Sequence, residues 1–319
     1  MRESDQTIHR AAWLYYTHNL RQEEVARVLN ISRASVAGYL RKARERGVVT
    51  VSTSTELFRQ SALARRLEDR LGLAMAWVVP GDSSFPPAIE IPFVAANAFL
   101  SLIGPGTRIA VAWGKTVYHI ADAMETADLK GVTVSQICGN LGAPYDYRPD
   151  QCTMEIARRL NAEGINLYAP LVLSSEELAA ALRREEVVAR QLASIATCDI
   201  VLYSVGGVEP DSHIVSCGAL PADSLPELRK LGAAGVIGGQ LIDAGGQWMD
   251  CPYNRRVISA DLDAVRRIPT RFMVVVEDEK YDALVAALGG GFATHLVISE
   301  TLGKRLLADY NPGGRNTRF

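Results

Sequence analysis

The sequence predicts a mainly parallel, Rossmann-like α/β domain preceded by a small all-α, winged helix-turn-helix domain. From residue 73 onward, short apolar runs alternate with amphipathic stretches, a pattern typical of a parallel sheet covered by helices on both faces. The first fifty residues instead carry short helical periods joined by turns. Charge follows the same division, because residues 1–50 hold nine Lys or Arg against five Asp or Glu, whereas the other 269 residues hold 25 against 31. We therefore expect two domains, residues 1–54 and residues 55–319.

The bulk composition of the 319 residues is that of an ordinary globular protein, with a formal net charge of −2. The opening residues are polar and no apolar run of about 18 residues occurs, so we expect neither a secretory signal nor a membrane span. The five cysteines form no CxxC pair and the five histidines are equally dispersed, so we expect no metal site. This cysteine usage also indicates a cytoplasmic protein.

Two helices near the amino terminus are expected from their apolar spacing. Residues 8–17 and residues 22–29 each place apolar side chains on one face. Asn30 then falls where the chain must turn, and asparagine tolerates the left-handed backbone conformation better than most residues. Ala26 is small at the point where the second helix would cross the next one.

A third helix is predicted from Ser32 to about Arg46. Serine is a favoured N-cap, and Gly47 would end the helix. Two short helices joined through Asn30 have the spacing of a helix-turn-helix. Residues 48–54 are expected to form the strand of a short wing.

The outward face of this third helix is basic, which predicts contact with duplex DNA. An arginine near the start of a recognition helix can reach guanine edges, and later cations suit phosphates. The residues expected to contact DNA are Arg21, Gln22, Ser32, Arg33, Ala34, Ser35, Tyr39, Arg41 and Lys42. The alternative interpretation is a plain three-helix bundle with a solvated basic face.

Residues 55–71 follow the amino-terminal domain and have two interpretations. Leu57, Ala64 and Leu71 recur at seven-residue spacing, as they would in a short dimerising helix. The simpler interpretation, which we favour, is the first helix of the next domain, packed by its leucine stripe on a sheet. Two heptads are too few to decide between them.

The large domain is expected to alternate strands and helices. The apolar runs span residues 73–80, 108–113, 131–139, 165–173, 198–207, 232–239, 271–277 and 294–299. Helical segments between them include residues 92–102, 117–125, 151–162, 175–196, 279–288 and 300–309. Small-molecule sites in such folds lie beyond the carboxyl ends of the strands.

Four strand ends concentrate glycine and polar residues, and we expect them to share one pocket. The turn from Trp113 to Thr116 opens a helix, so its backbone N–H groups, its hydroxyl and its ammonium group are suited to hold a phosphate. The other three strand ends are Gln136 to Asn140, Ser204 to Gly207, and Val276 to Lys280. Any one of them alone indicates only a turn or a surface charge, but their matching topological positions favour a shared site.

Several segments, taken in order, point to a known family. The first is YYTHNLRQEEVARVLNISRASVAGYLRKARERGVVTV. The large domain adds VAWGKTVYHIADAM, APLVL, LYSVGGVEPDS and ALVAALGGGFATHLVISETLGKRLL. With these segments the chain resembles the SorC family of bacterial sugar-responsive transcriptional regulators over nearly its whole length. The helix-turn-helix alone is shared by many families, whereas its combination with the later segments is much more specific.

The resemblance implies that the large domain is related to phosphosugar isomerases and sugar-phosphate deaminases. It is expected to bind a phosphorylated sugar or polyol as effector and to need no cofactor. The expected effector-binding residues are Trp113, Gly114, Lys115, Thr116, Gln136, Cys138, Gly139, Gly206, Gly207, Asp243 and Lys280. Family members often have paired glycines where this chain has Glu277-Asp278-Glu279. Three carboxylates there would repel a phosphate and favour sugar hydroxyls, which weakens the assignment of Lys280 as a phosphate contact.

The predicted function is a transcriptional regulator of a sugar or polyol catabolism operon, with operator affinity controlled by the effector and with no catalytic residues. The alternative is an enzyme that resembles sugar-phosphate isomerases or deaminases. Asp211 and His213 are of the right type for acid-base catalysis, but no glutamate follows His213 to complete the deaminase pattern. His119 is a second candidate, and Lys115 is the residue that would form a Schiff base with an aldehyde sugar.

The expected partners are double-stranded operator DNA, the sugar effector, and further copies of the chain in a homodimer or homotetramer. No membrane partner is expected. The sequence leaves open the identity of the effector, the operator sequence, and whether transcription is raised or lowered.

Overall fold

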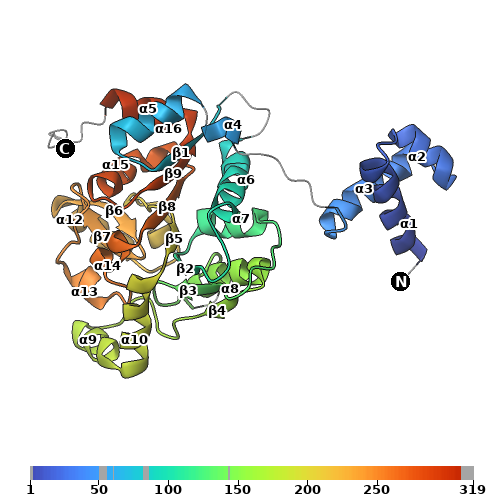
Figure 1. Cartoon of the computed structure of the whole chain (residues 1–319). Coiled ribbons are helices and arrows are strands. Elements are labelled where there is room, and N and C mark those ends of the chain that lie inside the picture. The colour runs from blue at the N-terminus through green and yellow to red at the C-terminus, as the bar shows by residue number, and fades with distance from the viewer. Residues whose placement is uncertain (1–2, 50–55, 60, 82–85, 143, 310–319) are drawn as a thin grey trace. The chain divides into compact units, whose positions relative to one another are not determined.

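The computed structural model describes residues 3–49, 56–59, 61–81, 86–142 and 144–309 (Figure 1). The chain divides into two compact units, Met1–Ser54 and Thr55–Phe319, and each is described by itself. Within the described residues, no helix is both long and apolar enough to cross a membrane.

The amino-terminal unit consists of three helices. They are α1 (Glu3–Ala12), which continues into the π-helical turn η1 (Trp13–Thr17), α2 (Gln22–Leu29) and α3 (Arg33–Glu45). Their common core is made of small and branched side chains, namely Ile8, Ala11, Ala12, Val25, Ala26, Val36, Leu40 and Ala43. Because Ala26 has so little bulk, α2 can approach α3 closely at this core.

The turn between α2 and α3 confirms the helix-turn-helix prediction in detail. Asn30 adopts the left-handed conformation with φ of 54°, and its N–H bonds back to carbonyls of α2. Ser32 caps α3, because its Oγ accepts a hydrogen bond from the backbone N–H of Ser35 at 3.0 Å. Gly47, with φ of +67°, follows the end of α3. The predicted wing strand, residues 48–54, lies mostly outside the described residues, and Val48 and Val49 are not in a strand.

The second unit begins with two short helices, α4 (Glu56–Arg59) and α5 (Ala62–Leu71). α5 packs against α16 (Glu300–Asp309) and against the first strand, with Ala64 and Leu67 fully buried. This packing supports the interpretation of residues 55–71 as the beginning of the large domain. The side chain of Leu57, part of the proposed heptad, lies outside the described residues.

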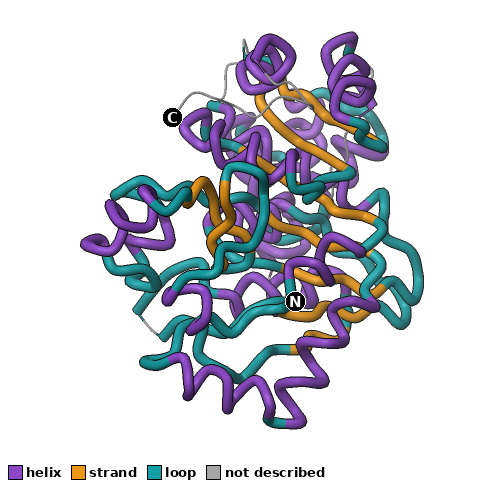
Figure 2. Tube along the Cα trace, turned by 90° about the vertical axis from the view of Figure 1, so that its left-hand side faces the viewer, coloured by secondary structure: helices purple, strands orange, loops and turns teal. Residues whose placement is uncertain are grey.

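A seven-stranded, wholly parallel sheet forms the centre of the second unit, which confirms the predicted fold class (Figure 2). Its strands are β1 (Met75–Val79), β2 (Arg108–Val111), β3 (Thr133–Gln136), β4 (Glu163–Ile165), β5 (Ile200–Tyr203), β8 (Thr270–Val275) and β9 (His295–Ser299). Their order across the sheet is β1-β9-β8-β5-β2-β3-β4.

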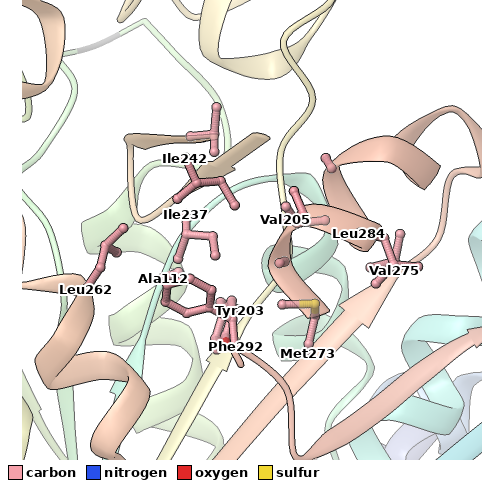
Figure 3. Close-up of a cluster of buried hydrophobic side chains, with 14 of the residues drawn as sticks. Ala112, Tyr203, Val205, Ile237, Ile242, Leu262, Met273, Val275, Leu284 and Phe292 are labelled. Atoms are coloured by element: carbon pink, nitrogen blue, oxygen red, sulfur yellow. The ribbon is translucent and has the colours of Figure 1, made fainter. Parts of the chain in front are cut away.

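Both faces of the sheet are covered, as continuous apolar strands require. One face packs on α6 (Pro87–Leu100), α7 (Lys115–Ala123) and α8 (Pro149–Leu160); the other packs on α5, α15 (Tyr281–Gly289) and α16. Successive residues of β5 alternate between the two cores, with Val201 and Tyr203 in one and Ile200 and Leu202 in the other. Figure 3 shows Tyr203 in the first of these cores beside Ala112 and Phe292.

The run at residues 232–239 is not a strand of the main sheet, which corrects the prediction. It contains β6 (Ala233–Ile237), which pairs antiparallel with β7 (Gln240–Asp243) in a separate hairpin. The hairpin forms because Gly238 and Gly239 both have positive φ, the backbone that a two-residue turn requires. The apolar content of this run resembles that of the sheet strands, so apolarity alone does not reveal the turn.

Two further expectations also need correction. The apolar run at residues 165–173 contributes only Ile165, at the end of β4, to the sheet, and the rest forms isolated bridges such as Val172 with Val257. The single helix expected over residues 175–196 is α9 (Glu176–Arg184) and α10 (Glu186–Ser194), separated at Glu185, followed by the short turn η2 (Ile195–Thr197). The remaining short elements are α11 (His213–Ser216), η3 (Ala222–Ser224), α12 (Leu225–Lys230), α13 (Pro252–Arg256), α14 (Leu262–Arg267) and η4 (Asp278–Lys280).

Candidate functional site

The strand order places a crevice between β2 and β5. After β2 the chain continues to β3 and β4 on one side, whereas after β5 it continues to β8 and β9 on the other. The connections therefore leave these two adjacent strands in opposite directions, and ligands of open α/β sheets bind at the carboxyl ends of such strands. β2 and β5 are hydrogen-bonded neighbours in parallel register, with Val111 opposite Leu202.

A pocket of about 470 Å³ lies at this position. Residues that follow β2, β5 and β8 line it, together with the turn of the β6–β7 hairpin and Tyr147. The structure brings seven of the predicted effector-binding residues together there: Trp113, Gly114, Lys115, Thr116, Gly206, Gly207 and Lys280. Those seven come from three strand ends that are far apart in the sequence.

The amino-terminal end of α7 opens on the pocket. Gly114 has φ of +110°, a backbone that side-chain-bearing residues rarely adopt, and its N–H donates to the carbonyl of Tyr147 at 3.2 Å. The N–H groups of Lys115, Thr116 and Val117 precede the first hydrogen bond within the helix, from the Tyr118 N–H to the Gly114 carbonyl, and lie at the positive end of the helix dipole. Lys115 and the buried Thr116 add an ammonium group and a hydroxyl to the same turn. This combination is suited to bind an anionic group such as a phosphate.

The segment after β5 is held by the hairpin. Gly206 and Val236 exchange two backbone hydrogen bonds, each of 2.9 Å, which ties the loop to β6. A Cβ added to Gly206 would lie 3.2 Å from the side chain of Val236, and one added to Gly207 would overlap the carboxylate of Glu209. A side chain at Gly206 would therefore need a small shift of Val236, and one at Gly207 would displace the carboxylate of Glu209.

Lys280 does not point into the pocket as a free cation. Its Nζ lies 2.8 Å from Oε2 of Glu277, and both side chains are largely shielded from solvent. Burial raises the pKa of the Glu277 carboxyl, but the charge and hydrogen bond of Lys280, with a smaller effect of Lys115, outweigh burial and hold that pKa below its ordinary value. Glu277 is therefore ionised at neutral pH, and it lines the pocket together with Glu279.

An aromatic wall closes one side of the pocket. The ring centroids of Trp113 and His213 lie 4.9 Å apart, and Tyr147 lies 6.2 Å from His213. Burial lowers the pKa of His213, with a further lowering by Lys280 and a partial offset by Glu277. The imidazole is therefore neutral at pH 7. The sequence suggests His213 only as a catalytic candidate and gives no sign of Tyr147, because no local motif marks a loop residue that contacts Gly114 through its backbone.

Four predicted residues do not line this pocket, namely Gln136, Cys138, Gly139 and Asp243. The side chain of Gln136 is fully buried and bonds inward, donating to the carbonyl of Cys138 at 2.5 Å and accepting from the N–H of Leu167 at 3.2 Å. Cys138 is fully buried as well, and burial raises the pKa of its thiol. The amide of Gln136 thus joins the segment that follows β3 to the backbone of Leu167.

Gly139 and Asp243 also have structural surroundings. A Cβ on Gly139 would lie 2.3 Å from the carbonyl oxygen of Pro170, so this glycine permits two backbones to approach. Oδ1 of Asp243 accepts hydrogen bonds from the N–H groups of Gly245 and Gln247, at 2.9 and 2.8 Å. Its carboxylate thus fixes the loop after β7, outside the pocket.

The amino-terminal unit presents the residues predicted to contact DNA. Arg21, Ser32, Arg33, Ala34, Arg41 and Lys42 are exposed, whereas Gln22, Ser35 and Tyr39 are half-buried. Nη1 of Arg33 lies 3.5 Å from Oε1 of Glu23, with side chains 69% and 70% exposed. An ion pair so open to water contributes only about 0–1 kcal/mol, so Arg33 can leave it at little cost.

Comparison with known proteins follows the same division of the chain. The Sugar-bind family model, described as "Putative sugar-binding domain", matches residues 55–308. The chain belongs to the SorC-type family of sugar-binding transcriptional regulators. This confirms the resemblance drawn from the sequence.

Individual relatives match over nearly the full length. The uncharacterized transcriptional regulator YjhU of Escherichia coli K12 is 28% identical over 312 residues, 96% of this chain and 95% of that protein. The deoxyribonucleoside regulator of Bacillus subtilis 168 is 26% identical over 311 residues, 97% of this chain and 99% of that protein. The full-length sorbitol operon regulator SorC of Klebsiella pneumoniae superposes with a TM-score of 0.70 at 21% identity, covering 96% of this chain and 100% of that one. The last comparison shows a shared fold.

Proposed function

We propose that this regulator binds operator DNA through α3 and senses a phosphorylated sugar or polyol in the pocket at the β2–β5 crevice. The observation that carries the proposal is the turn from Gly114 to Thr116, where a helix amino terminus, an ammonium group and a hydroxyl meet in a pocket of about 470 Å³. Such a volume is within the usual range for small-molecule sites, from about 300 to about 1,000 Å³. The regulated genes would be those of sugar or polyol catabolism.

The DNA-binding half of the proposal depends on an exposed basic helix. Arg33 stands at the start of α3, where recognition helices contact base edges, and Arg41 and Lys42 stand two turns later, where phosphates are within reach. Val36, Leu40 and Ala43 occupy the opposite, buried side of α3. The buried side of α3 packs on the core of the amino-terminal unit, so its exposed side is free to contact DNA.

The sensing half requires no cofactor. Backbone N–H groups at the start of α7, the Thr116 hydroxyl and Lys115 would hold the phosphate, while Trp113 and His213 would cover one side of the sugar. Binding would be linked to DNA affinity through a homodimer or homotetramer in which one arrangement of subunits favours both ligands. Allosteric coupling of this kind is typically worth about 1–3 kcal/mol, or roughly 5- to 150-fold in affinity.

The proposed site binds its ligand without turnover. General acid-base catalysis needs a titratable group oriented by a partner within hydrogen-bond distance. Nε2 of His213 is buried and has no hydrogen-bond partner among the described residues, and Asp211, two positions earlier, is exposed to solvent. The nearby carboxylate of Glu277 is already paired with Lys280. Sustained consumption of an added sugar phosphate by the purified chain would overturn this part of the proposal.

Thr116→Val tests the sensing half, because valine keeps the volume and removes the hydroxyl. A hydrogen bond to a charged group is worth about 1.5–3 kcal/mol, so sugar phosphates should bind roughly 10-fold or more weakly to the variant. Calorimetry and thermal shift with a panel of sugar phosphates provide the measurement. Thr126→Val, at an exposed position outside the pocket, is the control. Equal affinities of wild type and Thr116→Val would remove this turn from the binding site.

A further inference from the structure

The side chains that line the pocket carry more negative than positive charge. Two lysines, Lys115 and Lys280, face four carboxylates, Glu209, Asp211, Glu277 and Glu279. His213 adds no charge at neutral pH, because burial lowers its pKa. A pocket built only to hold phosphate groups would have the opposite balance, since phosphates are bound by cations and N–H donors.

Glu277 interacts electrostatically with three other residues that line the pocket. Its carboxylate is paired with Lys280 at 2.8 Å. The charge of Lys115 also lowers the pKa of Glu277, and the charge of Glu277 in turn raises the pKa of His213. Only about a third of its side chain is exposed to solvent, so water screens its charge less than that of an open surface group. The positive charge of Lys280 is therefore largely compensated within the protein before any ligand enters.

This pairing leaves the start of α7 as the one strongly electropositive region among the described pocket residues. There the backbone N–H groups and Thr116 supply donors, and Lys115 supplies a cation. One phosphate can be held at this turn. A second phosphate on the same sugar would lie within the small pocket close to Glu277 and Glu279, where like charges repel.

Carboxylates in the rest of the pocket are suited to a different part of the ligand. An ionised carboxylate accepts hydrogen bonds from hydroxyl groups, and such charge-assisted bonds are stronger than neutral ones. Glu277 and Glu279 could therefore receive the hydroxyls of a sugar or polyol whose phosphate lies at α7. Trp113, opposite His213, supplies an apolar face for the carbon chain.

We propose that Glu277 is a specificity-determining residue that makes the pocket select a sugar monophosphate with free hydroxyls and reject the corresponding bisphosphate. The inference depends on the proposed function, because it assumes that a phosphorylated sugar binds in this pocket. It adds which phosphorylated sugars are accepted and names the side chain responsible.

Calorimetry with matched pairs of ligands tests the selectivity. The probes are fructose 6-phosphate with fructose 1,6-bisphosphate, ribulose 5-phosphate with ribulose 1,5-bisphosphate, and glucose 6-phosphate with glucose 1,6-bisphosphate. Wild type should bind at least one monophosphate about 10-fold or more tightly than its bisphosphate, because a second phosphate would lie beside Glu277 and Glu279, whose two negative charges Lys280 offsets only in part. Glu277→Gln, which keeps the shape and removes the charge, should reduce that ratio about 10-fold, mainly by improving bisphosphate binding.

Asp282→Asn is the matched control. It removes one carboxylate from α15, two positions beyond Lys280, at an exposed site that does not line the pocket. Its selectivity should equal that of wild type within about twofold, since a solvent-exposed charge is well screened. An equal loss of selectivity in the control would show a general charge effect and would overturn the assignment to Glu277.

The double variant Glu277→Gln, Lys280→Gln keeps the proposal testable if the single variant is unstable. It replaces the ion pair as a unit, and it should retain monophosphate affinity within about threefold, because the phosphate is held at α7 and not by Lys280. A loss of monophosphate binding of about 10-fold or more would show that Lys280 anchors the phosphate, which would overturn the inference.

Two further outcomes distinguish a failure of the selectivity inference from a failure of the proposed function. If wild type binds a monophosphate and its bisphosphate equally well, the inference fails while the proposed function stands. If wild type binds no phosphorylated sugar of the panel, the proposed function fails and the inference fails with it.

Discussion

The two candidate sites of this protein are built in different ways. The predicted DNA-binding face comes from one continuous stretch, from Arg21 in front of α2 to Lys42 on α3, and its residues are positioned by a left-handed turn at Asn30 and a cap at Ser32. The pocket is assembled from strand ends and loops that span the sequence from Ala112 to Lys280. The first site can therefore be altered one side chain at a time, whereas the second depends on how the whole sheet is connected.

The two sites also differ in electrostatic design. The DNA-binding face exposes its arginines to water, where they remain available to a polyanion. In the pocket, Lys280 is paired internally with Glu277, so the charge of this lysine is compensated before a ligand arrives. This comparison predicts that changes in the first unit act through lost contacts, and that changes in the second act through packing and charge balance.

The largest effect, on the stability of the second unit, is expected from Gly139→Ala. The added Cβ would lie 2.3 Å from the carbonyl oxygen of Pro170, and backbone atoms cannot move aside as a flexible side chain can. We expect a loss of about 3 kcal/mol in the free energy of unfolding, at the upper end for overpacked sites. Chemical denaturation measures it, with Gly142→Ala as control because a Cβ there meets nothing within 4 Å. Unchanged stability of Gly139→Ala would show that this glycine is not needed for packing and would reopen its assignment to the ligand site.

A smaller effect, confined to DNA binding, is expected from Arg33→Ala. If Arg33 binds a guanine edge with two hydrogen bonds, its loss should weaken operator binding by about 1–3 kcal/mol and relax sequence preference at one position. Fluorescence anisotropy with a labelled operator measures this loss. Arg10→Ala removes an equal charge from the exposed side of α1 and serves as the control. Operator affinity and sequence preference like those of wild type would remove Arg33 from the DNA-reading set.

How much of each site the sequence predicts follows from this difference in construction. Helix periodicity, a turn asparagine and a capping serine are local signals, so α2 runs over the predicted residues 22–29 and Ser32 caps α3 as expected. The helix start at Gly114 to Thr116 is also predictable, because a glycine followed by polar residues is a local signal in the sequence. Gln136 gave the same kind of signal, yet its side chain bonds inward to Leu167, a residue 31 positions away. Whether a polar residue at a strand end faces a pocket depends on which segment crosses above it, and no local pattern records that.

The hairpin of β6 and β7 illustrates the same limit for the fold. Its apolar content is that of a strand in the main sheet, and only the double-glycine turn marks it as a hairpin. The pairing of Lys280 with Glu277 was not foreseen either, although the acidic stretch around it was noticed. Opposite charges three residues apart meet when the chain forms a helical turn, as it does in η4.

The smallest effect is expected from acid, through His213. Burial lowers the pKa of this residue below its ordinary value of 6.5. Below pH 6.5 the unfolded chain therefore binds a proton that the folded chain resists, so stability falls as the pH decreases, until the pH passes the folded-state pKa. Denaturation of wild type and His213→Gln at several pH values should show a shallower decrease in the variant, with part of the dependence remaining because burial also lowers the pKa of His295. A steeper decrease in the variant would contradict this account of the pocket.

The central claim is that a ligand in the pocket of the second unit controls the DNA affinity of the amino-terminal unit. One titration tests this claim most directly. The full chain is titrated into a labelled operator duplex, selected from a random-sequence library, at fixed salt with and without a saturating sugar monophosphate that binds by calorimetry. We predict that the ligand changes operator affinity by about 5- to 150-fold in wild type, and that at the same ligand concentration the change is smaller in Thr116→Val. Identical operator affinity with the pocket empty and with it filled would contradict the account.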